Sequence, residues 1–258
     1  MVCVVCISGC GGCGKSTFTV NLFHHYNGWR HVINGPPLST PHTVRRIHAD
    51  EFYLPPDRVP SIHLNGHTYD HNWDSPDAMD WEKLEDHVRV VVEEMKEEER
   101  ERKRERERGE SKEEERGEGV VLVEGFNLLY SKYLSAIATL RIVVDASRDD
   151  LVQRNYARDP AFFNANTSYF DDVLWPSHVS YVSYIHREYV ITHVTPPSPS
   201  SPSSSSVSSL FSASSDVSVG PMTSSCPIHP VTHVVSSSLL SAEAMVWVCC
   251  GLIDPMWT

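Results

Sequence analysis

A glycine-rich loop near the amino end constrains the fold of this chain more than any other feature. Residues 7–18 read ISGCGGCGKSTF, and the pattern Gly-x4-Gly-Lys-Ser that begins at Gly9 matches the P-loop pattern in full. An apolar run, VCVVCI at 2–7, precedes the loop and predicts a buried strand, while residues 16–26 have the apolar spacing of a helix. The chain therefore starts with the strand, loop and helix that this pattern requires.

The chemistry of such a loop is the binding of phosphate. Glycines let backbone N–H groups turn inward around phosphate oxygens, and the amino end of the following helix adds partial positive charge. Lys15 is expected to reach the β- and γ-phosphates and Ser16 to offer its hydroxyl to Mg²⁺. We predict a nucleotide site made by Gly9, Cys10, Gly11, Gly12, Cys13, Gly14, Lys15, Ser16 and Thr17.

Four cysteines around the loop, Cys3, Cys6, Cys10 and Cys13, have the spacing of metal ligands. Residues three apart on a strand point to opposite faces, and the inside of the loop must be left for phosphate. We therefore expect small buried residues rather than a metal cluster. Seven cysteines, an odd number, do not indicate a disulfide framework, which favours a reducing, intracellular setting.

Alternating elements predict the fold class. Apolar segments at 43–50, 120–125 and 140–146 read as strands, and helices are expected to begin at Ser75 and to cover 147–158. Strands that alternate with helices form a parallel sheet covered on both faces. The expected fold is α/β, of the P-loop NTPase type, with a mostly parallel sheet.

Composition divides the chain into a predicted domain at 1–195 and a C-terminal segment at 196–258. Within the domain, 22 of the 26 residues at 93–118 are charged, which predicts a solvated zone that cannot pack on a core, either a helical extension or a disordered insert. Fifteen of the 28 residues at 198–225 are serine, so we expect the C-terminal segment to be largely disordered.

Charge and hydropathy exclude several classes of partner. A net charge of −12 argues against a nucleic-acid partner bound through phosphate neutralisation. The amino end lacks the basic segment and cleavage pattern of a secretory signal, and the apolar run at 245–253 is too short to span a bilayer. We expect a cytoplasmic protein, with the nucleus as an alternative, that binds small molecules; the sequence does not indicate an oligomeric state.

Two carboxylates follow predicted strands that neighbour the loop. Ligands bind beyond the carboxyl ends of parallel strands, so Asp50 and Glu124 are expected to share one crevice with the loop. A carboxylate beside a γ-phosphate can accept a proton from an attacking hydroxyl or hold Mg²⁺ through water. The alternative is that each has only a local structural role, as Asp50 would if it merely capped a turn.

Three further positions have a functional and a structural interpretation. Trp73 offers a flat face for an aromatic ligand, and Asp74 beside it either binds a ligand or marks the start of a helix. Arg154 and Arg158, four residues apart, share one helix face. They either neutralise charge on a transferred phosphoryl group or form a solvated basic surface.

Six motifs occur in an order that resembles the nicotinamide riboside kinases, especially the fungal type, within the uridine kinase-like group of P-loop kinases. These are GxxxxGK(S/T), DEFY, NWDSPDAMDW, VEGF, a helix with paired arginines, and YFDDVLWP. The resemblance covers about residues 1–185 without the charged zone. The P-loop alone is generic, whereas NWDSPDAMDW and YFDDVLWP are much more specific.

The resemblance implies transfer of phosphate from ATP to the 5′-hydroxyl of nicotinamide riboside, giving nicotinamide mononucleotide for NAD synthesis. It implies that Asp50 is the general base and is linked to Mg²⁺, that Ser16 binds Mg²⁺, and that Lys15 and Glu124 also act in catalysis. Trp73 takes the place of the residue that stacks on the pyridine ring, and Arg154 and Arg158 that of the lid arginines. The implied substrate-binding residues are Asp50, Glu51, Phe52, Tyr53, Trp73, Asp74 and Asn155.

The chain departs from this family in two places. The lid sequence DPAFFNANTS is short, and Asn155 stands at a lid arginine position. Near residue 196 the chain becomes serine-rich, where the family continues into a helix, a strand with adenine-side contacts and a final helix. Two alternatives therefore stay open: a kinase for uridine, cytidine or another riboside, or an inactive nucleotide-binding interaction protein. The inactive alternative gains if residues 186–258 form no strand that completes the sheet.

Overall fold

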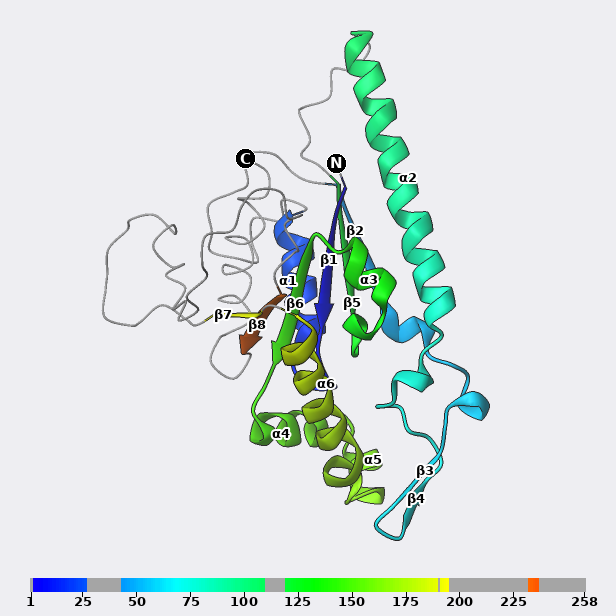
Figure 1. Ribbon diagram of the computed structural model, residues 1–258, viewed down its shortest axis with the longest axis vertical. Coiled ribbons are helices and arrows are strands. Elements are labelled where there is room, and N and C mark those ends of the chain that lie inside the picture. Colours follow the sequence, from blue (N-terminus) through cyan, green and yellow to red (C-terminus); the bar gives the residue numbers. More distant parts are fainter. Residues whose placement is uncertain (1, 27–42, 110–118, 190, 195–231, 237–258) are drawn as a thin grey trace, which may run out of the picture.

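The computed structural model describes residues 2–26, 43–109, 119–189, 191–194 and 232–236 (Figure 1). Its centre is a six-stranded sheet in the order β2-β5-β1-β6-β8-β7, and all its strand pairs are parallel. The strands are β1 (Val2–Ser8), β2 (Thr43–His48), β5 (Gly119–Gly125), β6 (Leu140–Asp145), β7 (Ile191–Val194) and β8 (Thr232–Ser236). The predicted α/β fold with a parallel sheet is confirmed.

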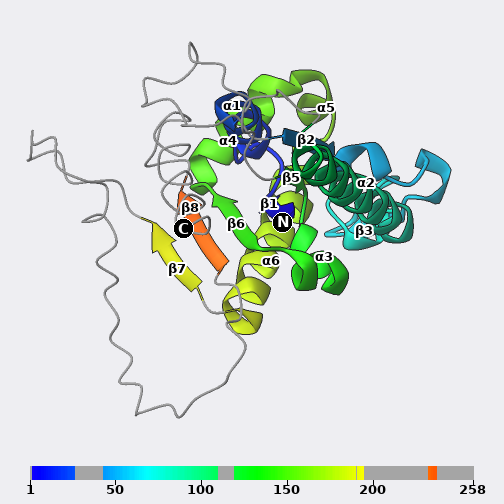
Figure 2. The same cartoon turned by 90° about the horizontal axis from the view of Figure 1, so that it is seen from above.

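Helices cover both faces of the sheet. They are α1 (Lys15–Tyr26), α2 (Trp81–Glu107), α3 (Lys132–Ile137), α4 (Arg148–Arg158), α5 (Pro160–Ala165) and α6 (Trp175–Glu188). Side chains from α1, α4 and α5 pack in one apolar core, and those from α2, α3 and α6 pack in the other. Figure 2 shows α1 and α3 on opposite sides of the central strands. A small antiparallel hairpin of β3 (Ile62–Leu64) and β4 (His67–Tyr69) stands apart from the sheet.

Strand β1 shows why the run at its start is apolar throughout. Val5 and Ile7 belong to one core, while Val4 and Cys6 belong to the other. A strand buried on both faces has no polar alternation, which is the pattern of a parallel sheet between helix layers. Cys3 likewise lies in the core opposite to that of Cys6, as predicted from their spacing.

The charged zone is partly a helix that packs on the domain. Residues 93–107 continue α2, in line with the helical alternative. Met95 is fully buried and lies against Gly119, and Glu99 accepts a hydrogen bond from the Gly119 N–H at 2.8 Å. The prediction that this zone cannot pack on a core is therefore wrong for its first residues, while most of the side chains from Arg100 to Glu107 are exposed. Residues 110–118 lie outside the described part.

The C-terminal segment contributes a strand. Thr232–Ser236 forms β8, which pairs with both β6 and β7, and Val235 is buried. The predicted boundary at residue 195 therefore leaves one strand of the sheet out of the domain. The rest of the serine-rich segment lies outside the described residues. Among the helices that the structure describes, none combines the length and apolar character needed to cross a membrane.

Candidate active site

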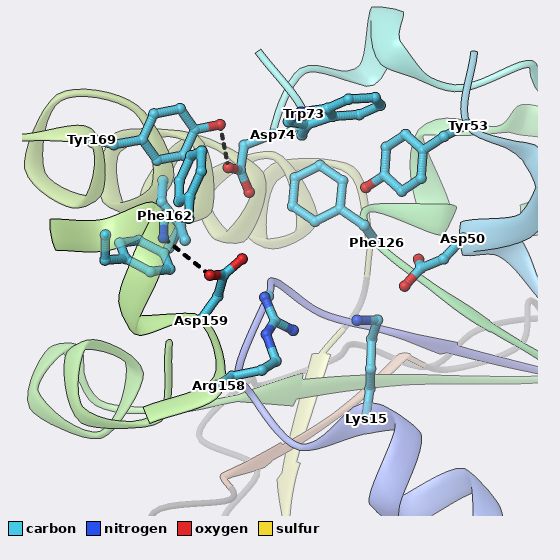
Figure 3. A pocket seen from close by; sticks show the side chains of 13 residues that line it. Lys15, Asp50, Tyr53, Trp73, Asp74, Phe126, Arg158, Asp159, Phe162 and Tyr169 are labelled. Carbon is cyan, nitrogen blue, oxygen red and sulfur yellow. Dashed lines mark hydrogen bonds between the residues drawn. The ribbon is translucent and has the colours of Figure 1, made fainter. Parts of the chain in front are cut away.

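The carboxyl ends of β1, β2 and β5 open onto a cavity of about 320 Å³. The glycine-rich loop, the turn after β2, the segment before α2 and the α4–α5 region all contribute to its walls. Figure 3 shows Lys15 and Asp50 facing the same space, with Asp74 and Trp73 across it. Seven predicted site residues line this cavity: Gly11, Lys15, Asp50, Tyr53, Trp73, Asp74 and Arg158. Arg158 lies at the end of α4.

The glycine-rich loop is a tight turn between β1 and α1. The Cys13 N–H donates to the Cys10 carbonyl at 3.4 Å, and Gly12 at the third position of this turn has a φ of 83°. Those values describe a type II turn, which needs glycine at that position. Lys15 follows as the first residue of α1, and its side chain is almost fully buried in the cavity wall.

Cys10 and Cys13 are both fully buried, as predicted for small packing residues. Their thiols share a hydrogen bond. That bond, with the nearby positive charge of Lys15, lowers the pKa of Cys13 to about 7, while the same bond and burial raise the pKa of Cys10. Both side chains lie beneath the loop in the same apolar core.

Glu124 and Ser16 meet at the floor of the site. Glu124 ends β5 and is 1% exposed, and its Oε2 accepts a hydrogen bond from Ser16 Oγ at 3.1 Å. Asp50 lies on a short 3-10 turn after β2 and keeps an exposed carboxylate. His48 lies between the two carboxylates, 2.6 Å from Glu124 Oε1 and 3.6 Å from Asp50 Oδ2. The structure thus brings Asp50, Glu124 and Ser16 together as expected, and adds a histidine that was not predicted.

Trp73 and Asp74 form the opposite wall. Asp74 Oδ2 accepts a hydrogen bond from the Tyr169 hydroxyl at 2.9 Å, and desolvation raises the pKa of this carboxyl. The Trp73 ring stacks on His71 at a centroid distance of 5.6 Å and meets Tyr53 edge to face at 5.6 Å. Asp74 precedes the helical turn at Pro76–Ala78 rather than α2 itself, so the helix α2 starts later than predicted.

Twelve predicted site residues do not line the cavity: Gly9, Cys10, Gly12, Cys13, Gly14, Ser16, Thr17, Glu51, Phe52, Glu124, Arg154 and Asn155. Phe52 is buried in the core against His87 of α2, and Glu51 is exposed on the outside of the same turn. Asn155 is fully buried and donates to the Gly11 carbonyl at 2.9 Å, so it holds the loop from behind. Arg154 lies beside it, with Nη1 3.5 Å from the Gly12 and Cys13 carbonyls.

Aromatic residues of the lid region complete the site and were not predicted. Phe162, Phe163 and Tyr169 line the cavity together with Phe126, Asp159 and Leu174. Asp159 caps α5 by accepting a hydrogen bond from the Phe162 N–H at 3.0 Å. The signal in the sequence was the aromatic content of DPAFFNANTSYF, which follows Arg158 directly.

Comparison with known proteins agrees with this architecture. The profile of the phosphoribulokinase/uridine kinase family matches residues 4–201, which span the loop, both carboxylates and the lid. No individual curated protein matches the chain. Because the match covers most of the chain, the protein belongs to the phosphoribulokinase/uridine kinase family.

Proposed function

We propose that the chain transfers phosphate from ATP to the 5′-hydroxyl of nicotinamide riboside, which yields nicotinamide mononucleotide for NAD synthesis. Its family consists of phosphotransferases, so ATP use and a nucleoside or sugar acceptor follow from membership. The main observation in favour of nicotinamide riboside as the acceptor is that the groups proposed for phosphate transfer and for binding the riboside line the same cavity. It holds Lys15 and Asp50 at one end and Trp73 with Asp74 at the other.

The far wall suits a riboside that carries a flat cationic base. An aromatic ring such as Trp73 attracts a cation over its face, and carboxylates nearby add Coulomb attraction. Asp74 is oriented by Tyr169 and offers oxygen acceptors for ribose hydroxyls. The motifs NWDSPDAMDW and YFDDVLWP, which supply these residues, support nicotinamide riboside over other ribosides.

The near end suits phosphoryl transfer. Backbone N–H groups of the loop and the Lys15 amine would hold the β- and γ-phosphates, and Asp50 would accept the proton of the 5′-hydroxyl. Arg158 reaches the same cavity from the lid and would offset charge on the transferred group. Catalysis would then rest on positioning and electrostatics, without a covalent intermediate.

The residues present fit a magnesium ion. Ser16, Asp50 and Glu124 present only oxygen donors, and Mg²⁺ prefers oxygen ligands and keeps several of its waters. Ser16 and Asp50 would hold the ion, with Glu124 behind them. When bound, Mg²⁺ would neutralise charge on the phosphates.

Two competing functions have different support from the family and from the sheet. Uridine kinases belong to the same family, so uridine is the main competing acceptor. The inactive alternative would have gained support from a sheet that lacked its last strands, and the described residues place β7 and β8 there. We therefore retain an active kinase, with the acceptor as the quantity to be measured.

A panel of ribosides tests this proposal. The protein is incubated with Mg-ATP and nicotinamide riboside, nicotinic acid riboside, uridine or cytidine, and the phosphorylated products are separated and quantified. We expect the highest turnover with nicotinamide riboside; turnover of uridine without nicotinamide riboside would overturn the choice of substrate.

Replacement of Asp50 tests the mechanism separately. Asp50→Ala is expected to abolish transfer while largely sparing ATP binding measured without Mg²⁺, because Asp50 is assigned to the acceptor and the metal, whereas the loop and Lys15 hold the phosphates. Asp57→Ala is the matched control, since Asp57 is an exposed carboxylate on the neighbouring turn and does not line the cavity. Near-normal turnover by Asp50→Ala would remove its role as the base.

A further inference from the structure

His48 is the last residue of β2, and its position in the sheet places it beside the proposed catalytic groups. In the parallel pairing of β2 with β5, His48 is the register partner of Glu124. Its two ring nitrogens contact two different carboxylates. Nδ1 lies 2.6 Å from Glu124 Oε1, and Nε2 lies 3.6 Å from Asp50 Oδ2.

The contacts continue through Glu124 to the first turn of α1. The second oxygen of Glu124 accepts the hydrogen bond from Ser16 Oγ. Asp50, His48, Glu124 and Ser16 therefore form one row that runs from the turn after β2, across β5, to the helix that follows the loop. Asp50, proposed both as the base and as a magnesium ligand, stands at one end of this row, and Ser16, the other proposed magnesium ligand, stands at the other.

Because Glu124 is buried, its carboxylate is sensitive to the loss of a neighbouring polar group. Glu124 is 1% exposed, and a buried carboxylate requires partners for both oxygens. Ser16 donates a hydrogen bond to one oxygen, and His48 Nδ1 lies 2.6 Å from the other, although this nitrogen makes no hydrogen bond among the described residues. Without the imidazole the Oε1 atom loses this close contact. The carboxylate would then be free to turn toward Ser16, or water would enter, and in both cases Asp50 would lose a neighbour that limits its rotation.

We propose that His48 is a positioning residue, which holds Glu124 and Asp50 at a fixed separation and so fixes Asp50, the proposed base, relative to Ser16, with which it would share the magnesium ion. This inference rests on the proposed kinase function. It requires a specific kinetic pattern, because the riboside base and ribose are assigned to Trp73 and Asp74 on other elements. Loss of His48 should lower kcat and the response to Mg²⁺, with KM for the riboside unchanged.

Three substitutions separate the two contacts. His48→Leu removes both nitrogens, His48→Asn keeps an amide nitrogen near the place of Nδ1, and His48→Gln keeps one near the place of Nε2. Replacement of residues that orient metal ligands usually lowers activity or metal affinity about 10–100-fold, and we expect such a fall in kcat for His48→Leu. His48→Asn should recover most of it, since the contact with Glu124 is the shorter one. His63→Leu, on the exposed hairpin, is the matched control.

A second readout does not depend on the acceptor. The affinity for a fluorescent, non-hydrolysable ATP analogue is measured with and without Mg²⁺, and the thermal midpoint is recorded for each variant. We expect His48→Leu to lose most of the magnesium-dependent gain in affinity while its midpoint stays near that of His63→Leu. If the wild-type protein phosphorylated no riboside, the proposed function would fail, yet this measurement would still decide the role of His48.

The outcomes that overturn the inference are distinct. A His48→Leu variant with normal kcat and a normal magnesium response would show that the contacts have no influence on the site. A His48→Leu variant in which kcat, the nucleotide affinity without Mg²⁺ and the thermal midpoint all fall, with no recovery in His48→Asn, would give a different result. It would show that the histidine only stabilises the end of the strand.

Discussion

Gly12 lies where the glycine-rich loop meets α4, and its replacement by alanine has two separable effects. Its φ of 83° is a backbone conformation that favours glycine, and a Cβ there would lie 2.5 Å from Asn155 Nδ2. Gly66, in the hairpin, has a φ of 80° but no atom within 4 Å of the equivalent Cβ position. Gly66→Ala therefore measures the backbone effect, and Gly12→Ala adds the collision.

The expected magnitudes follow from these contacts. A left-handed conformation costs an L-residue about 1–2 kcal/mol. The collision must displace the Asn155 amide, which donates to the carbonyls of Gly11 and Leu151, each at 2.9 Å. Leaving such buried groups unpaired costs about 1–3 kcal/mol. Unfolding free energy should therefore fall by about 2–5 kcal/mol in Gly12→Ala and by about 1–2 kcal/mol in Gly66→Ala.

Urea denaturation of four variants checks this reasoning. Besides the two alanine variants, Asn155→Ala and the double variant Gly12→Ala/Asn155→Ala complete a double-mutant cycle. Because Asn155→Ala removes the atom that the new Cβ meets, we expect a coupling energy of about 0.5–3 kcal/mol. ATP affinity should be reduced in Gly12→Ala and partly restored in the double variant. Equal losses in Gly12→Ala and Gly66→Ala, or strict additivity in the cycle, would refute the contact between the loop and Asn155.

Two further predictions concern the far wall and the charged helix. Burial raises the pKa of Asp74, so the folded state binds this proton more tightly than the unfolded state, and stability is lost as the pH rises from the ordinary carboxyl pKa of 3.8 through the raised value. Asp74→Asn should accordingly unfold at a higher temperature than wild type at neutral pH, and this difference should disappear in acid. Thermal unfolding scans at several pH values measure it. Riboside turnover should fall in the same variant. Met95→Ala should lower the unfolding free energy by about 2–5 kcal/mol in urea titrations, whereas Val90→Ala, at a position 54% exposed on the same helix, should change it by less than about 0.5 kcal/mol.

The residues that local chemistry could identify are those attached to strand ends and to the loop. Lys15, Asp50 and Glu124 were predictable because a parallel sheet brings the carboxyl ends of its strands together, whatever the intervening sequence. Tyr169 and Phe162 were missed because they come from the lid, and their approach to Asp74 depends on how α4 and α5 pack. No periodic pattern in the chain reports that packing.

Two errors on the fold have a related cause. The zone at 93–118 was judged by its average composition, but Met95 within it extends the buried face that α2 already has from Leu84 to Val92. Similarly, Thr232–Ser236 is a strand within a segment whose surroundings are rich in serine. Average composition reports the tendency to stay unfolded and cannot detect a few residues that find a partner far away in the chain. Phe52 shows the opposite error, because a motif position was read as a ligand contact although its side chain faces the core.

The place of β8 also affects how the protein is made. Ribosomes release a chain from its amino end, so β6 leaves the exit tunnel long before the neighbour that pairs with it. In the described part of the chain β7 pairs only with β8, so it cannot cover β6 in the meantime. Until Thr232–Ser236 has been synthesised, β6 lacks the strand that pairs with its outer edge, and an unpaired strand edge invites pairing with other chains. We expect newly synthesised protein to need holding chaperones, and premature termination before Thr232 to yield aggregates.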